Sequence, residues 1–186
     1  SDMLRSDDFS ARRILQRMNV RVVCTTDDPV DTLEHHRILR EEQSFPVSVL
    51  PAFRPDKALA IDAPVLFNRW VARLEAATDK DISDYTSFLE AIRKRHDFFH
   101  EAGCRLSDHG IEHPYAAAFT AKDAARAFDK ARRGKKPTAG ETLKFRSALL
   151  FELASMNAEK GWVQQLHMGA LRNVNSRALK ALGPDT

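Results

Sequence analysis

The chain has 186 residues, of which 43% are hydrophobic and 30% charged, a composition typical of a globular domain with a real core. Its 29 basic and 26 acidic residues give a net charge of +3, too small an excess to indicate a nucleic-acid partner. No apolar run approaches the roughly 20 residues that a membrane span needs. The N-terminal stretch SDMLRSDDFS also lacks the apolar segment of a signal peptide. We therefore expect a cytoplasmic protein that binds neither nucleic acid nor membrane.

The two cysteines, Cys24 and Cys104, both lie in apolar, strand-like runs. We expect two buried free thiols rather than a disulfide, in keeping with a reducing compartment. Neither cysteine belongs to a C-x-x-C pair, so their spacing indicates no metal site.

The first half of the chain alternates helical and strand patterns. In order, the patterns predict a helix over 9–18, a strand over 20–27, a helix over 27–42, a strand over 45–54 and a helix over 65–77. Ser10 is placed to cap the first helix. Asp28 is the expected N-cap of the second helix, with Pro29 in its first position.

The second half continues the same alternation. The patterns predict a helix over 83–103, a strand over 103–110, helices over 120–134 and 138–161, a strand over 161–170 and a closing helix over 175–186. Two of these helices open with the spacing of a capping box, formed by Thr120 with Asp123 and by Thr138 with Glu141.

The strands lack a clean polar–apolar alternation along their whole length, which is typical of strands covered on both faces. Helical crossovers between strands imply parallel pairing. The sequence therefore predicts an α/β protein with one domain over 1–186, in which about four parallel strands are joined by helices and extra helices decorate one rim.

Polar residues follow each predicted strand, and in a parallel sheet or barrel all of these ends lie on one face. Asp108 and His167 are suited to proton transfer, and Arg54 and Arg172 are suited to holding a carboxylate or phosphate. Each also has a structural interpretation. The aspartate and histidine could be hydrogen-bonded core groups or helix caps, and the arginines could form salt bridges to Asp27, Asp56 or Asp108.

Two further histidine pairs are weaker candidates. His35 and His36 are adjacent in a helix, where neighbouring side chains point in different directions and make a poor chelate. His96 and His100 have the i, i+4 spacing of a metal pair. They lie in a charged segment, RKRHDFFHEAG, for which we expect a surface helix.

Several uncommon sequence words stand at these strand ends. In order they are RVVCTTDDPVDTLEHHR, FRPDKA, GCRLSDHGI and GWVQQLHMGALRN, followed by LGPDT. On these words, nearly the whole chain strongly resembles the uronate (glucuronate) isomerase family of the amidohydrolase superfamily. The resemblance implies a distorted (β/α)8 barrel of TIM type and an aldose–ketose isomerase, an intramolecular oxidoreductase. Its reactions convert glucuronate to fructuronate and galacturonate to tagaturonate in cytoplasmic carbohydrate catabolism.

The resemblance also implies roles for individual residues. Asp108 is similar to the family's active-site aspartate and His167 to its active-site histidine. Arg54 and Arg172 are similar to the arginines that hold the hexuronate substrate. Supporting roles around the site are implied for a further set of residues: Thr26, Asp27, Ser107 and His109.

The chain departs from the family in its length and in its metal ligands. Family members are more than twice as long and bind a divalent metal, commonly zinc, through a His-x-His pair on the first barrel strand and an aspartate on the last. Neither feature is found here, so the resemblance implies the middle of the barrel with no metal ligand of its own. We expect such a piece to be inactive alone and to associate, and the family member to be a homo-oligomer.

Two alternatives stay open on the residues alone. One is a metal-dependent hydrolase of the same superfamily, which acts through metal-bound hydroxide. The other is a non-catalytic module that binds sugar acids or phosphates.

Overall fold

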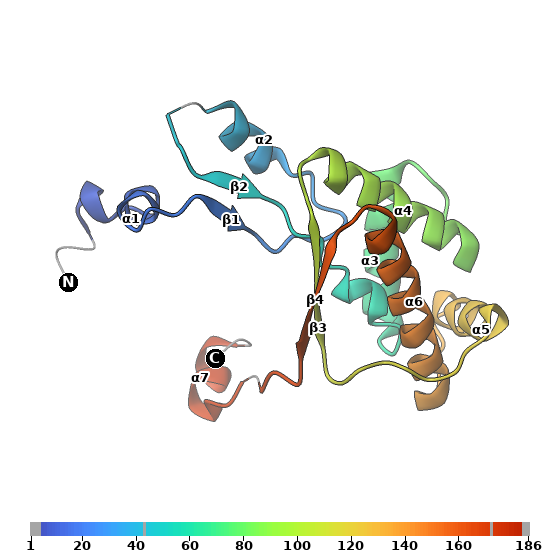
Figure 1. The fold of residues 1–186 in the computed structure, drawn as a ribbon. Coiled ribbons are helices and arrows are strands. Elements are labelled where there is room, and N and C mark those ends of the chain that lie inside the picture. The colour runs from blue at the N-terminus through green and yellow to red at the C-terminus, as the bar shows by residue number, and fades with distance from the viewer. Residues whose placement is uncertain (1–4, 43, 172, 184–186) are drawn as a thin grey trace.

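The computed structural model describes residues 5–42, 44–171 and 173–183 (Figure 1). Its strands are β1 (Val22–Cys24), β2 (Ser48–Leu50), β3 (Leu106–Ile111) and β4 (Val163–Met168). Its α-helices are α1 (Ala11–Arg17), α2 (Glu34–Glu41), α3 (Pro64–Thr78), α4 (Tyr85–Glu101), α5 (Ala121–Arg132), α6 (Ala139–Glu159) and α7 (Ser176–Leu182). Two 3₁₀ turns, η2 (Asp7–Phe9) and η3 (Asp56–Leu59), complete the described elements.

All strand pairing in the described residues is parallel, as the sequence predicts. β1 pairs with β2, and β3 pairs with β4. Isolated parallel bridges from Phe53 to Asp27 and to Ser107 link the two pairs. This α/β arrangement with helical crossovers fits part of a TIM-type barrel.

The strands are shorter than their apolar patterns, and β2 shows why. Pro46 precedes it and Pro51 follows it directly. Proline has no backbone N–H to donate to a ladder, so regular pairing does not continue through these positions. The chain around Phe53 nevertheless keeps contact on both sides. The Phe53 N–H donates to Leu106 and its carbonyl accepts from Asp108 on one side, and the Arg54 N–H donates to Asp27 on the other.

The predicted helix caps at Ser10, Thr120 and Thr138 are confirmed, and the last two form capping boxes. The predicted start of the second helix is wrong, since α2 begins at Glu34 rather than near Asp28. The Asp28 carboxylate instead accepts hydrogen bonds from the Val30 N–H and from the Trp70 indole. These bonds hold the preceding segment as a loop, which ends at Leu33 with φ 55°.

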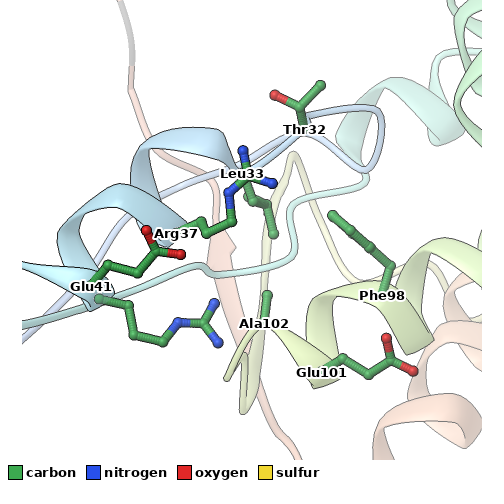
Figure 2. Close-up of a pocket in the computed structure, with 8 residues that line it drawn as sticks. Thr32, Leu33, Arg37, Glu41, Phe98, Glu101 and Ala102 are labelled. Carbon is green, nitrogen blue, oxygen red and sulfur yellow. The ribbon is translucent and has the colours of Figure 1, made fainter.

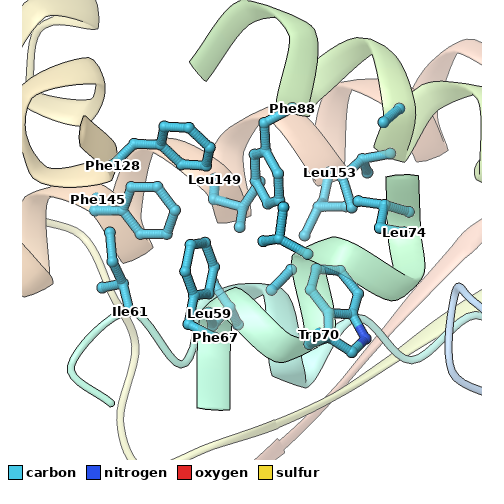
Figure 3. Close-up of a cluster of buried hydrophobic side chains, with 14 of the residues drawn as sticks. Leu59, Ile61, Phe67, Trp70, Leu74, Phe88, Phe128, Phe145, Leu149 and Leu153 are labelled. Carbon is cyan, nitrogen blue, oxygen red and sulfur yellow. The ribbon is translucent and has the colours of Figure 1, made fainter. Parts of the chain in front are cut away.

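The core is an aromatic and aliphatic layer formed by α3, α4, α5 and α6, which gather on one side of the β3–β4 pair (Figure 1). Figure 3 shows Phe67, Phe88, Phe128 and Phe145 facing one another within this layer. Their ring centroids lie 5.1 to 6.5 Å apart at tilted or edge-on angles. Such geometry adds to the free energy gained by burying the rings.

A chain of polar side chains crosses this core behind β3. His96 of α4 contacts Asn157 of α6 at 3.0 Å, and the Asn157 amide donates to Ser107 at 2.7 Å. The Ser107 hydroxyl lies 2.8 Å from Nε2 of His109. The expectation of a surface position for His96 is wrong, because the side chain is fully buried and its ring stacks on Trp162.

The expectation of two buried thiols is confirmed for Cys104 and wrong for Cys24, which is exposed. Cys24 is the last residue of β1, a strand whose only described strand partner is β2. Within the described residues, no helix combines the length and apolar character that crossing a lipid bilayer requires.

Strand β4 presents an uncovered surface in the described residues. Only β3 pairs with it, and Val163, Leu166 and Met168 are all exposed. An unpaired strand edge beside exposed apolar side chains is a surface on which other chains can add.

The buried imidazoles predict a pH-dependent stability. Burial lowers the pKa of His96 to about 4 and that of His109 to about 4, below the value of ~6.5 for an unfolded histidine. The unfolded chain therefore binds more protons in this window. Stability is fully present above about pH 6.5 and is lost as the pH falls toward 4. We expect the free energy of unfolding, from urea titrations, to fall on the order of 2 to 3 kcal/mol per histidine. A His96→Gln variant should lose about half of the slope, and an unchanged slope would contradict the assignment.

The exposed strand predicts self-association of this chain. Light scattering should show oligomers or aggregates that increase with protein concentration. Val163→Lys on β4 should shift the distribution toward monomer, because association through this strand would bury the lysine charge. Val65→Lys is the matched control, since Val65 is 65% exposed and Val163 is 66% exposed. A monodisperse monomer of the unaltered chain at every concentration would show that this surface does not associate.

Candidate active site

Asp108, in the middle of β3 rather than at its end as the sequence predicts, meets His167 near the end of β4. In the parallel register Asp108 pairs with Gln165 and Gly110 with His167. Side chains two residues apart in a strand share a face, so Asp108, Gly110, Gln165 and His167 lie on one side of the sheet. Nδ1 of His167 lies 2.6 Å from Oδ1 of Asp108, and Nε2 of His167 lies 3.0 Å from the Gln165 amide.

Arg54 reaches this pair from the segment that follows β2. Its Nη1 lies 3.5 Å from Oδ2 of Asp108, and its Nε donates to Oδ2 of Asp56 at 2.8 Å. The Asp108 side chain is buried, while about a quarter of the Arg54 side chain is exposed. One buried carboxylate therefore contacts both an imidazole and a guanidinium, the groups that respectively exchange protons and hold anions near neutral pH.

Two partners of Asp108, Arg54 and His167, border a cavity of about 450 Å³. Its lining is Arg54, Asp56, Gly110, Ile111, Glu112, His167 and Ala170. The volume falls within the usual range for small-molecule sites, and the lining is rich in charged side chains. The cavity can therefore admit a small polar molecule against the Asp108–His167 pair.

Asp56 is hydrogen-bonded to both strand β3 and Arg54. Its two carboxylate oxygens accept from the Gly110 N–H at 3.1 and 3.2 Å, while one of them also accepts from Arg54. Burial raises the pKa of Asp56, and the Arg54 guanidinium opposes that shift. Arg54 thus forms salt bridges with both Asp56 and Asp108, as the structural interpretation of the sequence allowed, and it also lines the cavity.

The residues expected in supporting roles lie outside the cavity lining. The Asp27 carboxylate accepts from the Thr25 hydroxyl and from the Ala52 N–H, which ties β1 to the segment after β2. Ser107 and His109 point from β3 toward the helices, where they join the polar chain through Asn157.

Arg172, expected to bind substrate, lies outside the described residues, and Thr26 is exposed. Gly110 and Gln165 were not among the residues expected at the site. Residues two apart in a strand share a face, so Gln165 lies on the face of His167 and Gly110 on the face of Asp108. The spacing in the printed sequence could therefore have identified both residues.

The described residues contain no group of three or more His, Cys, Asp or Glu side chains arranged to hold a metal ion. We therefore derive no chemical step of this chain through a metal.

A second cavity, of about 310 Å³, lies between α2 and the end of α4 (Figure 2). Arg37, Arg40, Glu41 and Glu101 surround an apolar floor that includes Phe98. Its cations and carboxylates balance in number. None of the site residues expected from the sequence belongs to its lining, so it offers weaker grounds for a site than the cavity beside Asp108.

Comparisons with known proteins point to one family. A family model described as glucuronate isomerase matches residues 1–186. The chain is 47% identical over 186 residues to the uronate isomerase of Bacteroides fragilis, and it spans 40% of that protein's length. It is 44% identical, over 40% of the length, to the uronate isomerase of Caldanaerobacter subterraneus.

Two solved structures share its fold. The crystal structure of uronate isomerase from Thermotoga maritima matches with a TM-score of 0.85 and 37% identity, over 94% of this chain and 38% of that chain. The crystal structure of glucuronate isomerase from Caulobacter crescentus matches with a TM-score of 0.85 and 31% identity, over 99% of this chain and 38% of that chain. By family match, sequence identity and fold together, the chain belongs to the glucuronate isomerase family.

Proposed function

We propose that this chain forms the substrate-holding side of a uronate isomerase active site. The enzyme would interconvert glucuronate with fructuronate and galacturonate with tagaturonate. The observation that carries the proposal is the contact of Asp108 with both His167 and Arg54 at the edge of one cavity. The relatives are named as isomerases, so neither the hydrolase nor the binding module is favoured.

The reaction moves a hydrogen between two neighbouring carbons of an open-chain sugar acid through an enediol. A proton leaves C2, the C1 carbonyl oxygen gains a proton, the C2 hydroxyl loses one, and C1 gains one. The Asp108–His167 pair, 2.6 Å apart, is suited to exchange the protons of the two oxygens, because an imidazole can give or accept a proton near neutral pH. Movement of the carbon-bound proton needs a base that we do not assign to this chain.

Arg54 would hold the carboxylate at the far end of the sugar acid. A guanidinium binds carboxylates through a planar pair of N–H groups, which fixes direction as well as charge. Holding the far end decides which carbon faces the Asp108–His167 pair, and such orientation is a large part of catalysis. Arg172 is proposed for the same task. Asp27, Ser107 and His109 would act indirectly by supporting the strands.

The chain spans about 40% of the length of the curated relatives it matches. We propose that it supplies, as one partial-barrel domain, the middle strands of the barrel. A divalent metal, commonly zinc in the family that the chain resembles, would be held by the part of the relatives' length that this chain does not span. A cytoplasmic homo-oligomer is proposed for the complete enzyme.

The first prediction is that this 186-residue chain alone does not turn over glucuronate. We assign carboxylate binding to Arg54 and proton exchange to the Asp108–His167 pair, and the described residues contain no cluster able to hold a metal. An assay for fructuronate with zinc, manganese and no added metal should stay at background. Calorimetric titration of the same chain with glucuronate measures substrate binding separately from turnover. Metal-dependent turnover would overturn the division of the site proposed here.

The second prediction concerns the pair itself in a chain that has the full length of the relatives. Asp108→Asn and His167→Gln should each lower kcat by about 10²- to 10⁴-fold, the usual range for lost proton transfer. Asp97→Asn is the control, because Asp97 lies on α4 and pairs with Lys160 away from the cavity. Activity within a factor of about two of the unaltered enzyme in both site variants would remove the pair from the mechanism.

A further inference from the structure

Gly110 lies inside strand β3, where glycine is usually a disadvantage. It has no side chain to pack and costs more backbone entropy on folding than other residues. Its φ lies outside the left-handed region, so the backbone conformation itself does not require glycine. A glycine in such a position often marks a place where another group approaches the backbone closely.

The group that approaches Gly110 is the Arg54–Asp56 ion pair. A Cβ atom built on Gly110 would lie 2.5 Å from Nη2 of Arg54 and 3.0 Å from Oδ2 of Asp56. The first distance is far shorter than a van der Waals contact, so a side chain at this position would displace the guanidinium. The missing side chain therefore provides the space in which the guanidinium lies against β3.

Asp56 completes the arrangement by bonding both the strand and the guanidinium. It accepts the backbone N–H of Gly110 and the Nε–H of Arg54 at the same time. Strand β3, the carboxylate and the guanidinium thus form one hydrogen-bonded unit, which places Nη1 of Arg54 3.5 Å from Asp108. A side chain held in this way loses less rotamer entropy when it binds a ligand than a mobile arginine does.

We infer that Gly110 and Asp56 are positioning residues that hold the guanidinium of Arg54 against strand β3, in the orientation that receives the carboxylate of the substrate. The inference rests on the proposed function only for the identity of the anion. The argument for the placement of Arg54 uses three contacts: Gly110 with Arg54, Gly110 with Asp56, and Asp56 with Arg54.

The test of placement is spectroscopic and is made in a chain that has the full length of the relatives. With arginine labelled by ¹⁵N at Nε, the Arg54 signal is identified as the one that Arg54→Lys removes. Gly110→Ala and Asp56→Asn should each shift this signal and speed its exchange with water. Gly140→Ala is the matched control, because a Cβ on Gly140 meets nothing within 4 Å. The indole N–H signal of Trp70, which donates to Asp28, verifies that each variant is folded.

The test of consequence is kinetic, in the same proteins. Gly110→Ala and Asp56→Asn should raise KM for glucuronate by about 10- to 100-fold, the range for losing a charge-assisted hydrogen bond, with a smaller change in kcat. In an Arg54→Lys background, Gly110→Ala should raise KM by at most about twofold more, because Nη2 of Arg54, the atom that the new Cβ would displace, is absent. A purely structural role would give equal losses in both backgrounds.

The outcomes separate the two proposals. An Arg54 signal unchanged in both variants overturns the positioning role, whatever the kinetics show, and so do additive losses in the double variant. If the unaltered full-length protein fails to isomerise hexuronates, the proposed function falls, and the signal still decides whether Gly110 and Asp56 place Arg54.

Discussion

The parallel register of β3 with β4 is the constraint on which the site depends. A strand turns successive side chains to opposite faces, so a slip of one residue would exchange the two faces. In the observed register Asp108 faces His167, while Ser107 and His109 face the helices. A slip would also strip Ser107 of its bond from Asn157 and place the Asp108 carboxylate in the core, and both changes are costly. The buried polar chain behind β3 therefore protects the geometry of the cavity in front of it.

On the cavity side of the sheet, the charges of Arg54, Asp56 and Asp108 depend on one another. Asp56 and Asp108 both contact Arg54, so the guanidinium relieves the repulsion between two partly buried carboxylates. Removal of the cation would leave both carboxylates poorly compensated, and removal of either carboxylate would release the cation. Under the proposed function, loss of stability and loss of substrate binding are therefore coupled at Arg54, and only a measurement that reports the position of its side chain separates them.

Much of this organisation could be predicted from the sequence, because it depends on local patterns. The order of elements, the caps at Ser10, Thr120 and Thr138, and parallel pairing follow from periodicity and spacing. The start of α2 and the burial of His96 could not be predicted, because both depend on partners far along the chain. Trp70 binds Asp28 across 42 residues, and Asn157 contacts His96 across 61. A charged local sequence says little about which of its histidines a distant helix will cover.

Residue type alone also fails to locate the chemistry at the strand ends. Thr25, Asp27 and His36 have the composition of a proton-transfer group and lie close together, with Thr25 Oγ1 2.6 Å from Asp27 and 2.7 Å from His36. Their contacts, with one from the Ala52 N–H, tie β1, α2 and the segment after β2 together. None of the three lines the cavity. Asp108 also has two partners, His167 at 2.6 Å and Arg54 at 3.5 Å, and both of these line that cavity. What distinguishes the carboxylate proposed for catalysis from a structural one here is whether the groups that contact it also line a cavity.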